Sequence, residues 1–357
     1  MKIGILTFHR SRNYGAVLQA YGLTKTIKEI ENDIEIIDYV CVPIENTLRL
    51  WIPNKNIIRS LKQFVFRFQK KKAFKSFIRK WLPVTNKRNI KKETLPEELK
   101  KYDCIIAGSD QIWNTKLTNN DEVYFLDIPE VRAKRISYAG STGDYIYLNE
   151  KNIESLKAFQ NISVREMKLK SYLNQNKINA TLCCDPALLL TCSDYLKIKS
   201  KQLSKHKYIF LFMIWESDEL IYLAQKYAQE NDCIVISNKK CLKFFLHCKP
   251  EDFLSWIYHA DCVLTNSFHG TVFSLLFHKL FISDISRPNG EVNERIQDIL
   301  KAVNCMECIL TDKAKREGIQ FNCVDFNEID KRLSVLRNHS LEWLRQTLMT
   351  QRSVKNL

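Results

Sequence analysis

The sequence of 357 residues lacks the long hydrophobic runs that mark a membrane protein. No apolar stretch approaches the roughly 20 residues that a membrane-spanning helix needs, so we expect no transmembrane segment. The first ten residues, MKIGILTFHR, become polar too early for a secretory signal peptide. With 45% hydrophobic and 27% charged residues, the sequence predicts a globular, cytoplasmic protein large enough for two domains.

Glycine is scarce, and the spaced glycines of a dinucleotide-binding loop are absent. Lys2–Phe8 predicts a first buried strand, but the turn that follows it contains a single glycine, Gly15. We therefore expect no nicotinamide cofactor. The polar residues of this turn either contact a ligand or cap the helix that follows; they are His9, Arg10, Arg12 and Asn13.

Paired cysteine motifs are also lacking, although the chain has 12 cysteines. Most lie singly in apolar, strand-like stretches such as the one around Cys262, which predicts reduced core residues and no disulfide framework. Cys183 with Cys184, and Cys305 with Cys308, have no second pair at zinc-ligand spacing. We expect no structural metal site.

Acidic residues are missing from one long segment. Between Asn46 and Lys92 there are 15 Lys and Arg and no Asp or Glu, and the other 40 basic residues equal the 40 acidic ones. This segment therefore carries the whole formal net charge of +15. Apolar residues recur in it at helical spacing: Ile57, Ile58, Leu61, Phe64, Val65 and Phe68, then Phe74, Phe77, Ile78 and Trp81. Basic residues lie between them: Arg59, Lys62, Arg67, Lys71, Lys75 and Arg79.

Segment 46–92 thus predicts a basic amphipathic helix, or a pair of helices, inserted in the first domain. Two interpretations stay open. Either the basic face meets an anionic surface, such as lipid headgroups at the inner face of the cytoplasmic membrane, or the aromatic stripe packs on the domain and the lysines are only solvated. We expect no nucleic-acid partner, because no nucleic-acid-binding motif accompanies the basic run.

Strand and helix patterns alternate along the rest of the chain, which is typical of α/β folds with parallel sheets. Strand-like apolar runs lie at 34–40, 102–107, 135–139 and 161–164, and after a lysine-rich connector at 208–215, 233–237, 262–264 and 281–285. The predicted organisation is a domain at 1–190, a linker at 191–207 and a second domain at 208–325. An amphipathic helix at 326–357 closes the chain and is free to pack back on the first domain.

Polar residues follow several predicted strands, at the sheet edge where α/β folds bind ligands. Asp110 follows the strand at 102–107, where its carboxylate could orient a sugar hydroxyl; its alternative role is a helix or turn cap. Arg165 follows the strand at 161–164. It either clamps a phosphate or carboxylate, or forms a surface pair with the glutamate beside it.

A strand, a polar turn and a helix follow one another between Asp261 and Lys279. We place the turn at residues 266–271. His269 lies inside it and can exchange a proton near neutral pH. A helix start at the end of a strand favours an anionic ligand. The small and hydroxyl residues that would let an anion approach are Ser267, Gly270 and Thr271. The alternative is an ordinary capped helix whose histidine is only hydrogen-bonded.

Six motifs, in their order and spacing, resemble those of the polysaccharide pyruvyl transferase family over nearly the whole chain up to about residue 303. They are Asn13-Tyr-Gly-Ala16 with Leu18-Gln-Ala-Tyr21, Gly108-Ser-Asp-Gln-Ile-Trp-Asn114, Ser137-Tyr-Ala139, Ser163-Val-Arg-Glu166, Asp185-Pro186 and Thr265-Asn-Ser-Phe-His-Gly-Thr271. His269 matches the family's histidine and Arg165 the arginine of its Val-Arg pair. Gly140-Ser-Thr-Gly143 departs from the family's more usual Ala-Ser-Phe-Gly.

The resemblance implies an α/β fold of two Rossmann-like domains in a GT-B-like arrangement, with the site in the interdomain cleft. It implies phosphoenolpyruvate as the donor substrate, with no separate cofactor. The acceptor would be a sugar of a cell-surface polysaccharide or of its lipid-linked precursor, which receives pyruvate as a ketal while phosphate is released. The first domain would be the acceptor side and the second the donor side.

On this basis we assign His269 and Asp110 as catalytic residues. The residues assigned to the donor, whose phosphate and carboxylate need cations and N–H groups, are Arg165, Ser267, Gly270, Thr271, Arg287 and Arg295. The residues assigned to the acceptor are His9, Asn13, Tyr14 and Gln111. Two other functions stay open: a GT-B glycosyltransferase with a nucleotide-sugar donor, since a fold does not define the donor, and a non-catalytic glycan-binding protein at the membrane face.

Overall fold

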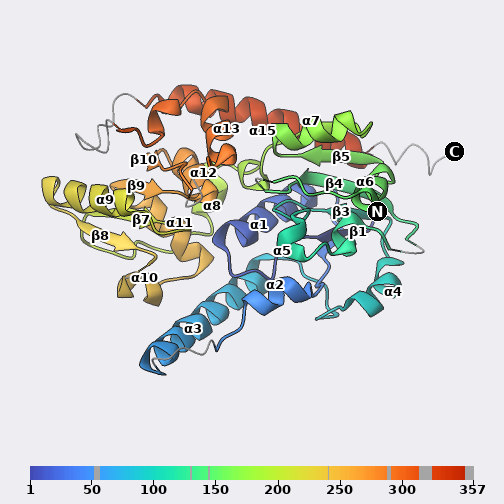
Figure 1. The fold of residues 1–357 in the computed structure, drawn as a ribbon, viewed down its shortest axis with the longest axis horizontal. Coiled ribbons are helices and arrows are strands. Elements are labelled where there is room, and N and C mark those ends of the chain that lie inside the picture. The colour runs from blue at the N-terminus through green and yellow to red at the C-terminus, as the bar shows by residue number, and fades with distance from the viewer. Residues whose placement is uncertain are drawn as a thin grey trace. The chain divides into compact units, whose positions relative to one another are not determined.

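The computed structural model describes residues 1–51, 57–128, 131–143, 145–239, 241–287, 291–312 and 324–349 (Figure 1). The chain divides into two compact units. Unit 1 comprises Met1–Leu190 together with the chain from Leu336 onward, and unit 2 comprises Thr191–Val335.

Unit 1 is built on a six-stranded sheet in which every strand pair is parallel, in the order β2-β1-β3-β4-β5-β6. The strands are β1 (Ile3–Leu6), β2 (Ile34–Ile36), β3 (Cys104–Ala107), β4 (Lys134–Gly140), β5 (Asn161–Val164) and β6 (Ala180–Leu182). The central strands β1 and β3 are buried throughout, because helices cover both faces of such a sheet. This accounts for their unbroken apolar sequences, IGIL and CIIA.

The helices of unit 1 connect these parallel strands. They are α1 (Tyr14–Lys28), α2 (Val42–Thr47), α3 (Ile57–Trp81), α4 (Leu95–Leu99), α5 (Thr115–Thr118), α6 (Glu150–Lys157) and α7 (Met167–Gln175). Helix α1 begins where Asn13 Oδ1 accepts hydrogen bonds from the backbone N–H groups of Gly15 and Ala16. Nearly all of α1 is buried, so it is a core helix and not a surface helix.

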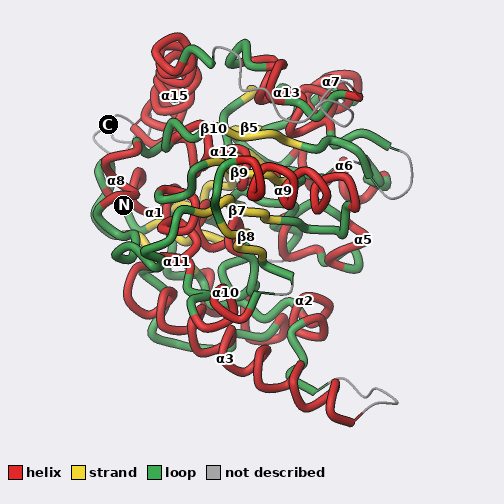
Figure 2. Tube along the Cα trace, turned by 90° about the vertical axis from the view of Figure 1, so that its left-hand side faces the viewer, coloured by secondary structure: helices red, strands yellow, loops and turns green. Residues whose placement is uncertain are grey.

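Unit 2 contains a four-stranded parallel sheet in the order β10-β9-β7-β8, which Figure 2 shows with the strands one below another. The strands are β7 (Tyr208–Phe212), β8 (Ile234–Ser237), β9 (Cys262–Thr265) and β10 (Leu280–Ser283). Its helices are α8 (Cys192–Leu196), α9 (Asp218–Glu230), α10 (Leu242–Leu246), α11 (Pro250–Tyr258), α12 (Phe268–Leu276) and α13 (Glu294–Ala302). The α/β fold with parallel sheets that the sequence predicts is confirmed in both units.

The segment 191–207 differs from the predicted linker. It begins with α8 and belongs to unit 2. Tyr195 is fully buried, and its ring meets that of Phe273 edge-on at 4.9 Å between centroids. Ser200 is also attached to α11, since its Oγ donates to Asp252 Oδ1 at 2.5 Å. The lysines that suggested a linker are the exposed side of a segment whose apolar side chains complete the core of unit 2.

The last described helix, α15 (Phe326–Met349), belongs to unit 2 up to Val335 and to unit 1 from Leu336. In unit 1, Ser340 Oγ accepts from the backbone N–H of Cys184 at 2.9 Å, and Lys134 Nζ donates to the carbonyl of Thr347 at 2.8 Å. The Trp343 ring lies 6.1 Å from that of Tyr138. The closing helix expected from the sequence thus packs on the first unit through its second half.

Among the described residues of the basic segment 46–92, Ile57–Trp81 form one long helix, α3, and extended chain follows it. The second half of α3 packs on α1 through aromatic rings: Phe74 lies 5.0 Å from Tyr14, and Phe77 lies 6.3 Å from Tyr21. The aromatic residues at helical spacing are therefore partly core residues, as the packing interpretation predicts. In the described part of the chain, every helix is too short or too polar to cross a bilayer.

Candidate functional site

His269 lies in the first turn of α12, directly after β9 in unit 2. The helix begins earlier than the sequence suggested, at Phe268 and not at Val272, because Ser267 caps it. Ser267 Oγ accepts from the backbone N–H of Gly270 at 3.3 Å, which replaces an acceptor that the helix itself cannot supply there. Of the predicted turn at 266–271, only Asn266 and Ser267 connect β9 to α12, and the remaining four residues are the start of the helix.

Thr265 and Gly270 explain how this helix start approaches the sheet so closely. A Cβ atom at position 270 would overlap with Thr265 Oγ1, so glycine is needed there. Thr265 Oγ1 donates to the carbonyl of Phe212 at 2.7 Å and accepts from Ser267 N at 3.0 Å. Thr271 Oγ1 lies 2.7 Å from Ser283 Oγ. Ser267, Gly270 and Thr271 are all buried and hold α12 to strands β7, β9 and β10; their donor-binding roles stay predictions.

Two aromatic rings and two arginines lie beside this helix start. The ring of Phe268 meets the His269 ring edge-on at 5.1 Å, and the Arg295 guanidinium lies 5.6 Å from the same phenyl ring. The Arg287 guanidinium lies 5.5 Å from the Trp215 ring. Guanidinium groups stack on aromatic faces while keeping N–H donors for an anion. The structure thus brings His269 and Arg295 to one aromatic side chain.

Side chains that the sequence reasoning missed fix the loops around this corner. Asn266 Oδ1 accepts from Ile214 N at 2.7 Å and its Nδ2 donates to the carbonyl of Trp215 at 3.0 Å, which ties the loop after β7 to the end of β9. Asp284 accepts from Ser217 Oγ at 3.0 Å and from Ser286 N at 2.9 Å. Asn266 is part of the Thr265–Thr271 motif, so its position at a strand end was the available signal.

The corner in unit 2 has the parts that an anionic substrate needs. The carboxyl ends of β7, β9 and β10 meet here, and α12 directs its N-terminal end, the positive end of its dipole, to this edge of the sheet. His269 is largely buried, at 9% exposed, and its Nε2 is shielded from solvent. A histidine beside cations and a helix start can donate a proton to a bound anionic substrate.

In unit 1, four motifs that are far apart in sequence meet around Arg165. Its Nη1 donates to Asp185 Oδ2 at 2.6 Å and its Nε to Glu166 Oε1 at 3.2 Å, and its Nη2 lies 3.5 Å from Asp110 Oδ1. The motif Ser137-Tyr-Ala139 contacts the Arg165 motif through a hydrogen bond, in which Ser137 Oγ donates to the carbonyl of Ser163 at 2.9 Å. The observed partners of Arg165 are therefore carboxylates from three loops, and binding of the donor by Arg165 stays a prediction.

This cluster is buried, and its carboxylates outnumber its cation. The Arg165 side chain is 3% exposed, so burial alone would lower its pKa, but the charges of Glu166, Asp185 and Asp110 hold the pKa above the ordinary arginine value. Ser141 Oγ donates to Glu166 Oε1 at 2.5 Å. Ser141 lies in the Gly140–Gly143 stretch, which thereby supplies a hydrogen bond to the network.

Asp110 itself has a backbone φ of 72°, in the left-handed region that aspartate adopts more readily than most residues. Its Oδ1 accepts from the backbone N–H of Gln111 at 2.9 Å. The Gln111 side chain is also engaged, since its Oε1 accepts from Asn114 Nδ2 at 2.7 Å. Asp110 therefore combines the predicted turn-capping contact with the ion pair to Arg165, and its catalytic role stays a prediction.

The other residues assigned to the acceptor have structural contacts in unit 1. Asn13 caps α1, and Tyr14 is buried under Phe74 of α3. His9 is 1% exposed; its Nδ1 donates to the carbonyl of Thr7, 3.1 Å away, and its Nε2 lies 2.9 Å from Asp38 Oδ1. Their acceptor-binding roles stay predictions, and these contacts show how each holds the end of β1 and the start of α1.

Asp38 is the centre of a second charged cluster in unit 1. Its Oδ1 accepts from Arg10 Nη1 at 2.8 Å as well as facing His9, and its Oδ2 accepts from Asn89 N at 2.9 Å. Burial alone would raise the pKa of Asp38, but the hydrogen bonds from His9, Asn89 and Arg10 hold it well below the ordinary aspartate value.

Replacing Asp38 by Asn should lower the free energy of unfolding by roughly 3 kcal/mol near neutral pH, because it leaves the buried His9 without its carboxylate and removes one of the two carboxylates that pair with Arg10. The folded-state pKa is depressed, so the contribution of Asp38 is complete above the unfolded value and is lost as the pH falls below about 4. Urea unfolding near neutral pH and at about pH 3 measures this effect. The difference in free energy of unfolding between the parent protein and Asp38→Asn should be smaller at the acidic pH.

The matched control for this prediction is Asp33→Asn, an exposed aspartate in the loop before β2. It should leave both the stability and its pH dependence close to those of the parent protein. A constant difference between the parent and Asp38→Asn from neutral to acid pH would contradict the proposed ion pairing of Asp38.

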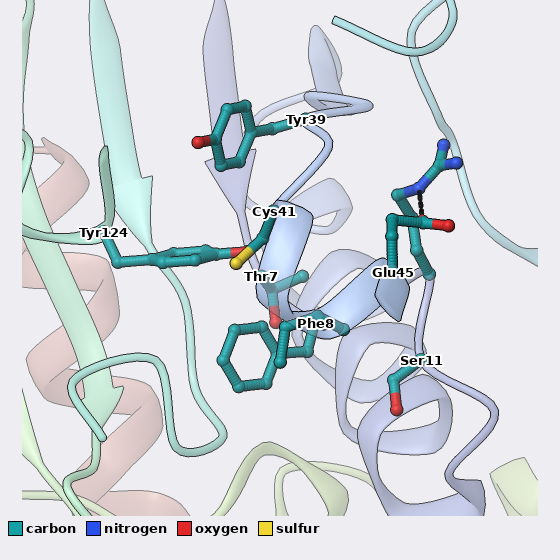
Figure 3. A pocket seen from close by; sticks show the side chains of 9 residues that line it. Thr7, Phe8, Ser11, Tyr39, Cys41, Glu45 and Tyr124 are labelled. Atoms are coloured by element: carbon teal, nitrogen blue, oxygen red, sulfur yellow. Dashed lines mark hydrogen bonds and ion pairs between the residues drawn. The ribbon is translucent and has the colours of Figure 1, made fainter. Parts of the chain in front are cut away.

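A small pocket lies next to this cluster, between β1, α2 and the segment around Tyr124 (Figure 3). The residues lining it are Thr7, Phe8, Arg10, Ser11, Tyr39, Cys41, Ile44, Glu45 and Tyr124. Its volume of about 10 Å³ suits about one water molecule and not a sugar. Burial raises the pKa of the Cys41 thiol to about 12, so Cys41 is no thiolate nucleophile near neutral pH.

The side chains that could bind a metal or form a disulfide are dispersed or reduced in the part of the chain that the structure describes. Among the described residues, no three His, Cys, Asp or Glu side chains gather in a way that would hold a metal ion. The cysteines in the described ranges are free thiols, and most of them are buried.

Comparison with solved structures gives several similar proteins. The chain is similar to a protein assigned as a UDP-N-acetylglucosamine 2-epimerase from Listeria monocytogenes, with 8% identity over 97% of this chain and 90% of that one and a TM-score of 0.50. The UDP-GlcNAc 2-epimerase from Methanocaldococcus jannaschii shares 11% identity over 95% and 93%, with a TM-score of 0.47. The heptosyltransferase II from E. coli that acts with ADP-heptose shares 11% identity over 95% and 99%, with a TM-score of 0.36.

At 8% identity, the similarity to the Listeria monocytogenes structure supports a shared GT-B-like fold. It carries no information about substrates. The predicted cleft between the two domains stays a prediction. No match was found among the curated proteins that were compared.

The sequence comparison is more specific than the structural one. A family model described as polysaccharide pyruvyl transferase matches residues 13–283, which is well over half of the chain. This range includes the cap of α1, the Arg165 cluster and the corner that contains His269. The chain belongs to the polysaccharide pyruvyl transferase family.

Proposed function

We propose that this protein transfers the pyruvyl group of phosphoenolpyruvate to a sugar of a cell-surface polysaccharide or of its lipid-linked precursor, as a ketal, with release of phosphate. Family membership supports an enzyme that modifies a polysaccharide. The observation that carries the proposal further is the corner of unit 2, where His269 and Arg295 lie beside the Phe268 ring at the N-terminus of α12.

The donor carries a phosphate and a carboxylate, and both need positive charge. Arg295 and Arg287 are the candidate cations, since each lies over an aromatic ring at the carboxyl edge of the unit 2 sheet. The first turn of α12 adds the positive end of a helix dipole. These groups would hold the anion with the enol carbons directed to His269.

In the reaction we propose, His269 gives a proton to C3 of the enol, which becomes the methyl group and leaves C2 electrophilic. A sugar hydroxyl forms a C–O bond to C2 and loses its proton. The C2–O bond to phosphate breaks, and phosphate leaves with the bonding electrons. A second hydroxyl of the same sugar then closes the ketal and loses its proton, so that one diol and one phosphoenolpyruvate give one ketal and one phosphate.

Asp110 is the proposed partner of the acceptor hydroxyl in unit 1. It lies at the carboxyl end of β3 and keeps its carboxylate within 3.5 Å of Arg165. A carboxylate held in this way accepts a hydrogen bond from a hydroxyl and can take up its proton. Its left-handed backbone, fixed by the turn after β3, would set the direction of that carboxylate.

Release of phosphate from phosphoenolpyruvate tests the function. We expect phosphate release that depends on both the protein and a sugar acceptor, measured with a panel of free and lipid-linked hexosides, together with a mass gain on the acceptor that matches pyruvate as a ketal. Release of nucleotide from nucleotide-sugars instead would identify a glycosyltransferase. Binding of glycans with no release of either product would identify a glycan-binding protein and overturn the proposal.

A further inference from the structure

The outer face of helix α3 carries an exposed apolar stripe in unit 1. Its five members are Ile57, Ile58, Leu61, Val65 and Phe68, whose side chains are between 44% and 71% exposed. Ile57 and Ile58 are adjacent and the others follow at steps of three or four residues, which places all five on one face about 100° wide. Large apolar side chains gathered on one face in this way are unusual for a protein surface and indicate a contact site.

Basic side chains continue the same face toward the end of the helix. Lys72, Lys75 and Arg79 are exposed and follow the apolar residues at the same helical spacing. Lys72 Nζ lies 5.5 Å from the ring of Phe68, where the apolar and basic parts meet. No Asp or Glu occurs between Asn46 and Lys92, so no acid within this segment neutralises these charges.

The opposite face of α3 attaches the helix to unit 1. Ala73, Phe74 and Phe77 are buried, and the two phenyl rings contact Tyr14 and Tyr21 of α1. The fold therefore uses the inner face, and the outer apolar stripe makes no comparable contribution to the core. A second aromatic, Trp51, is 44% exposed and lies 6.2 Å from Phe64.

We propose that the outer face of α3, defined by Ile57, Ile58, Leu61, Val65, Phe68, Lys72, Lys75 and Arg79, docks on an anionic lipid surface with the helix lying in the headgroup region. A helix with an apolar stripe and flanking Lys and Arg has the composition of interfacial helices, and the exposed Trp51 ring lies beside this helix at Phe64. The apolar residues would enter the acyl boundary, and the basic residues would pair with lipid phosphates.

The charge and the apolar stripe of this face favour a lipid surface over a second copy of the chain or an acidic polymer. A second copy of the chain would bring together two segments that each hold 15 basic and no acidic residues, and like charges at close range oppose association. An acidic polymer would use the basic residues but would leave the apolar stripe exposed to water. A lipid surface satisfies both halves of the face at once.

Vesicle binding tests the proposal with the full-length protein. In flotation at low salt, we expect association with phosphatidylcholine vesicles that contain about one third phosphatidylglycerol and none with phosphatidylcholine alone. Binding should be strongly reduced at about 1 M salt, where the Debye length is about 3 Å. No binding to the anionic vesicles at low salt would overturn the proposal.

Three variants locate the contact. Lys72→Gln with Lys75→Gln and Arg79→Gln should weaken binding to anionic vesicles at least tenfold, since each charge near such a surface contributes roughly a fivefold factor. Ile58→Ser with Leu61→Ser and Val65→Ser should weaken it as well and shift Trp fluorescence less on vesicle addition. The matched control Lys197→Gln with Lys201→Gln and Lys205→Gln removes the same number of charges from an exposed segment of unit 2 and should bind as the parent does.

Two outcomes would assign the face to another occupant. Equal weakening by the control would show attraction by net charge alone, without a specific face. A concentration-dependent dimer in sedimentation without lipid, abolished by the apolar variant, would show that a second copy covers the stripe. Because no assay here includes phosphoenolpyruvate or a sugar, failure of this proposal is separate from failure of the proposed reaction.

Discussion

Replacing His269 by Gln is expected to lower acceptor-dependent phosphate release by roughly 10²–10⁴-fold, the usual effect of removing a general acid. Glutamine has a similar size and keeps hydrogen-bonding groups at the start of α12, so the helix cap by Ser267 and the packing of Gly270 on Thr265 should persist. The measurement is the steady-state rate of phosphate release with saturating phosphoenolpyruvate, together with the melting temperature.

The matched control for this prediction is His206→Gln, an exposed histidine in the loop before β7. It should leave both the rate and the melting temperature unchanged. If His269→Gln also retains the parent rate, His269 takes no part in proton transfer. A large fall in melting temperature together with the rate would mean that His269 serves the packing of α12 and not the chemistry.

Arg165→Met is expected to lower the free energy of unfolding by about 3–5 kcal/mol, because it leaves the buried carboxylates of Asp110, Glu166 and Asp185 without their cation. The effect should be largest near neutral pH and should shrink in acid, since protonation removes the repulsion among the three carboxylates. Urea unfolding at several pH values measures both the size of the loss and its dependence on pH.

Arg165→Lys provides the graded control, because it keeps the charge but cannot reach three carboxylates with one planar group. Its stability should fall between those of the parent and Arg165→Met. Unchanged stability of Arg165→Met with a raised KM for phosphoenolpyruvate would instead show that Arg165 binds the donor, as the sequence alone suggested.

The sequence was sufficient to predict most of the sheet structure. Strands such as β1, β3 and β9 are fully buried in parallel sheets, and burial on both faces requires unbroken apolar runs that are visible without a structure. Strand β6, Ala180–Leu182, was missed because its sequence, ATL, contains no apolar run, whereas the equally short edge strand β2 begins a longer apolar run. The start of α12 was missed because His269, Gly270 and Thr271 in its first turn read as a polar turn, and the cap by Ser267 shows where the helix begins.

The sequence predicted where the candidate site residues lie in the fold, but it did not predict which residues they contact. The rule that ligands bind at the carboxyl ends of parallel strands indicated His269, Asp110 and Arg165. It could not indicate that Arg165 pairs with Asp185, because that contact depends on how β5 and β6 align in three dimensions. In the same way, nothing local predicts that Asn266 joins two loops through both ends of its amide group.

The division of α15 between the two units determines the order in which the chain can finish folding. Unit 1 needs Ser340 to satisfy the backbone N–H of Cys184 and Thr347 to accept from Lys134. On the ribosome, these residues are made only after Thr191–Val335, which at 5–20 residues per second takes roughly 7–30 s. During that interval the Tyr138 ring lacks its contact with the Trp343 ring. Water and chaperones can then reach the part of the unit 1 surface that the second half of α15 later covers. The first unit to begin folding therefore completes its core last.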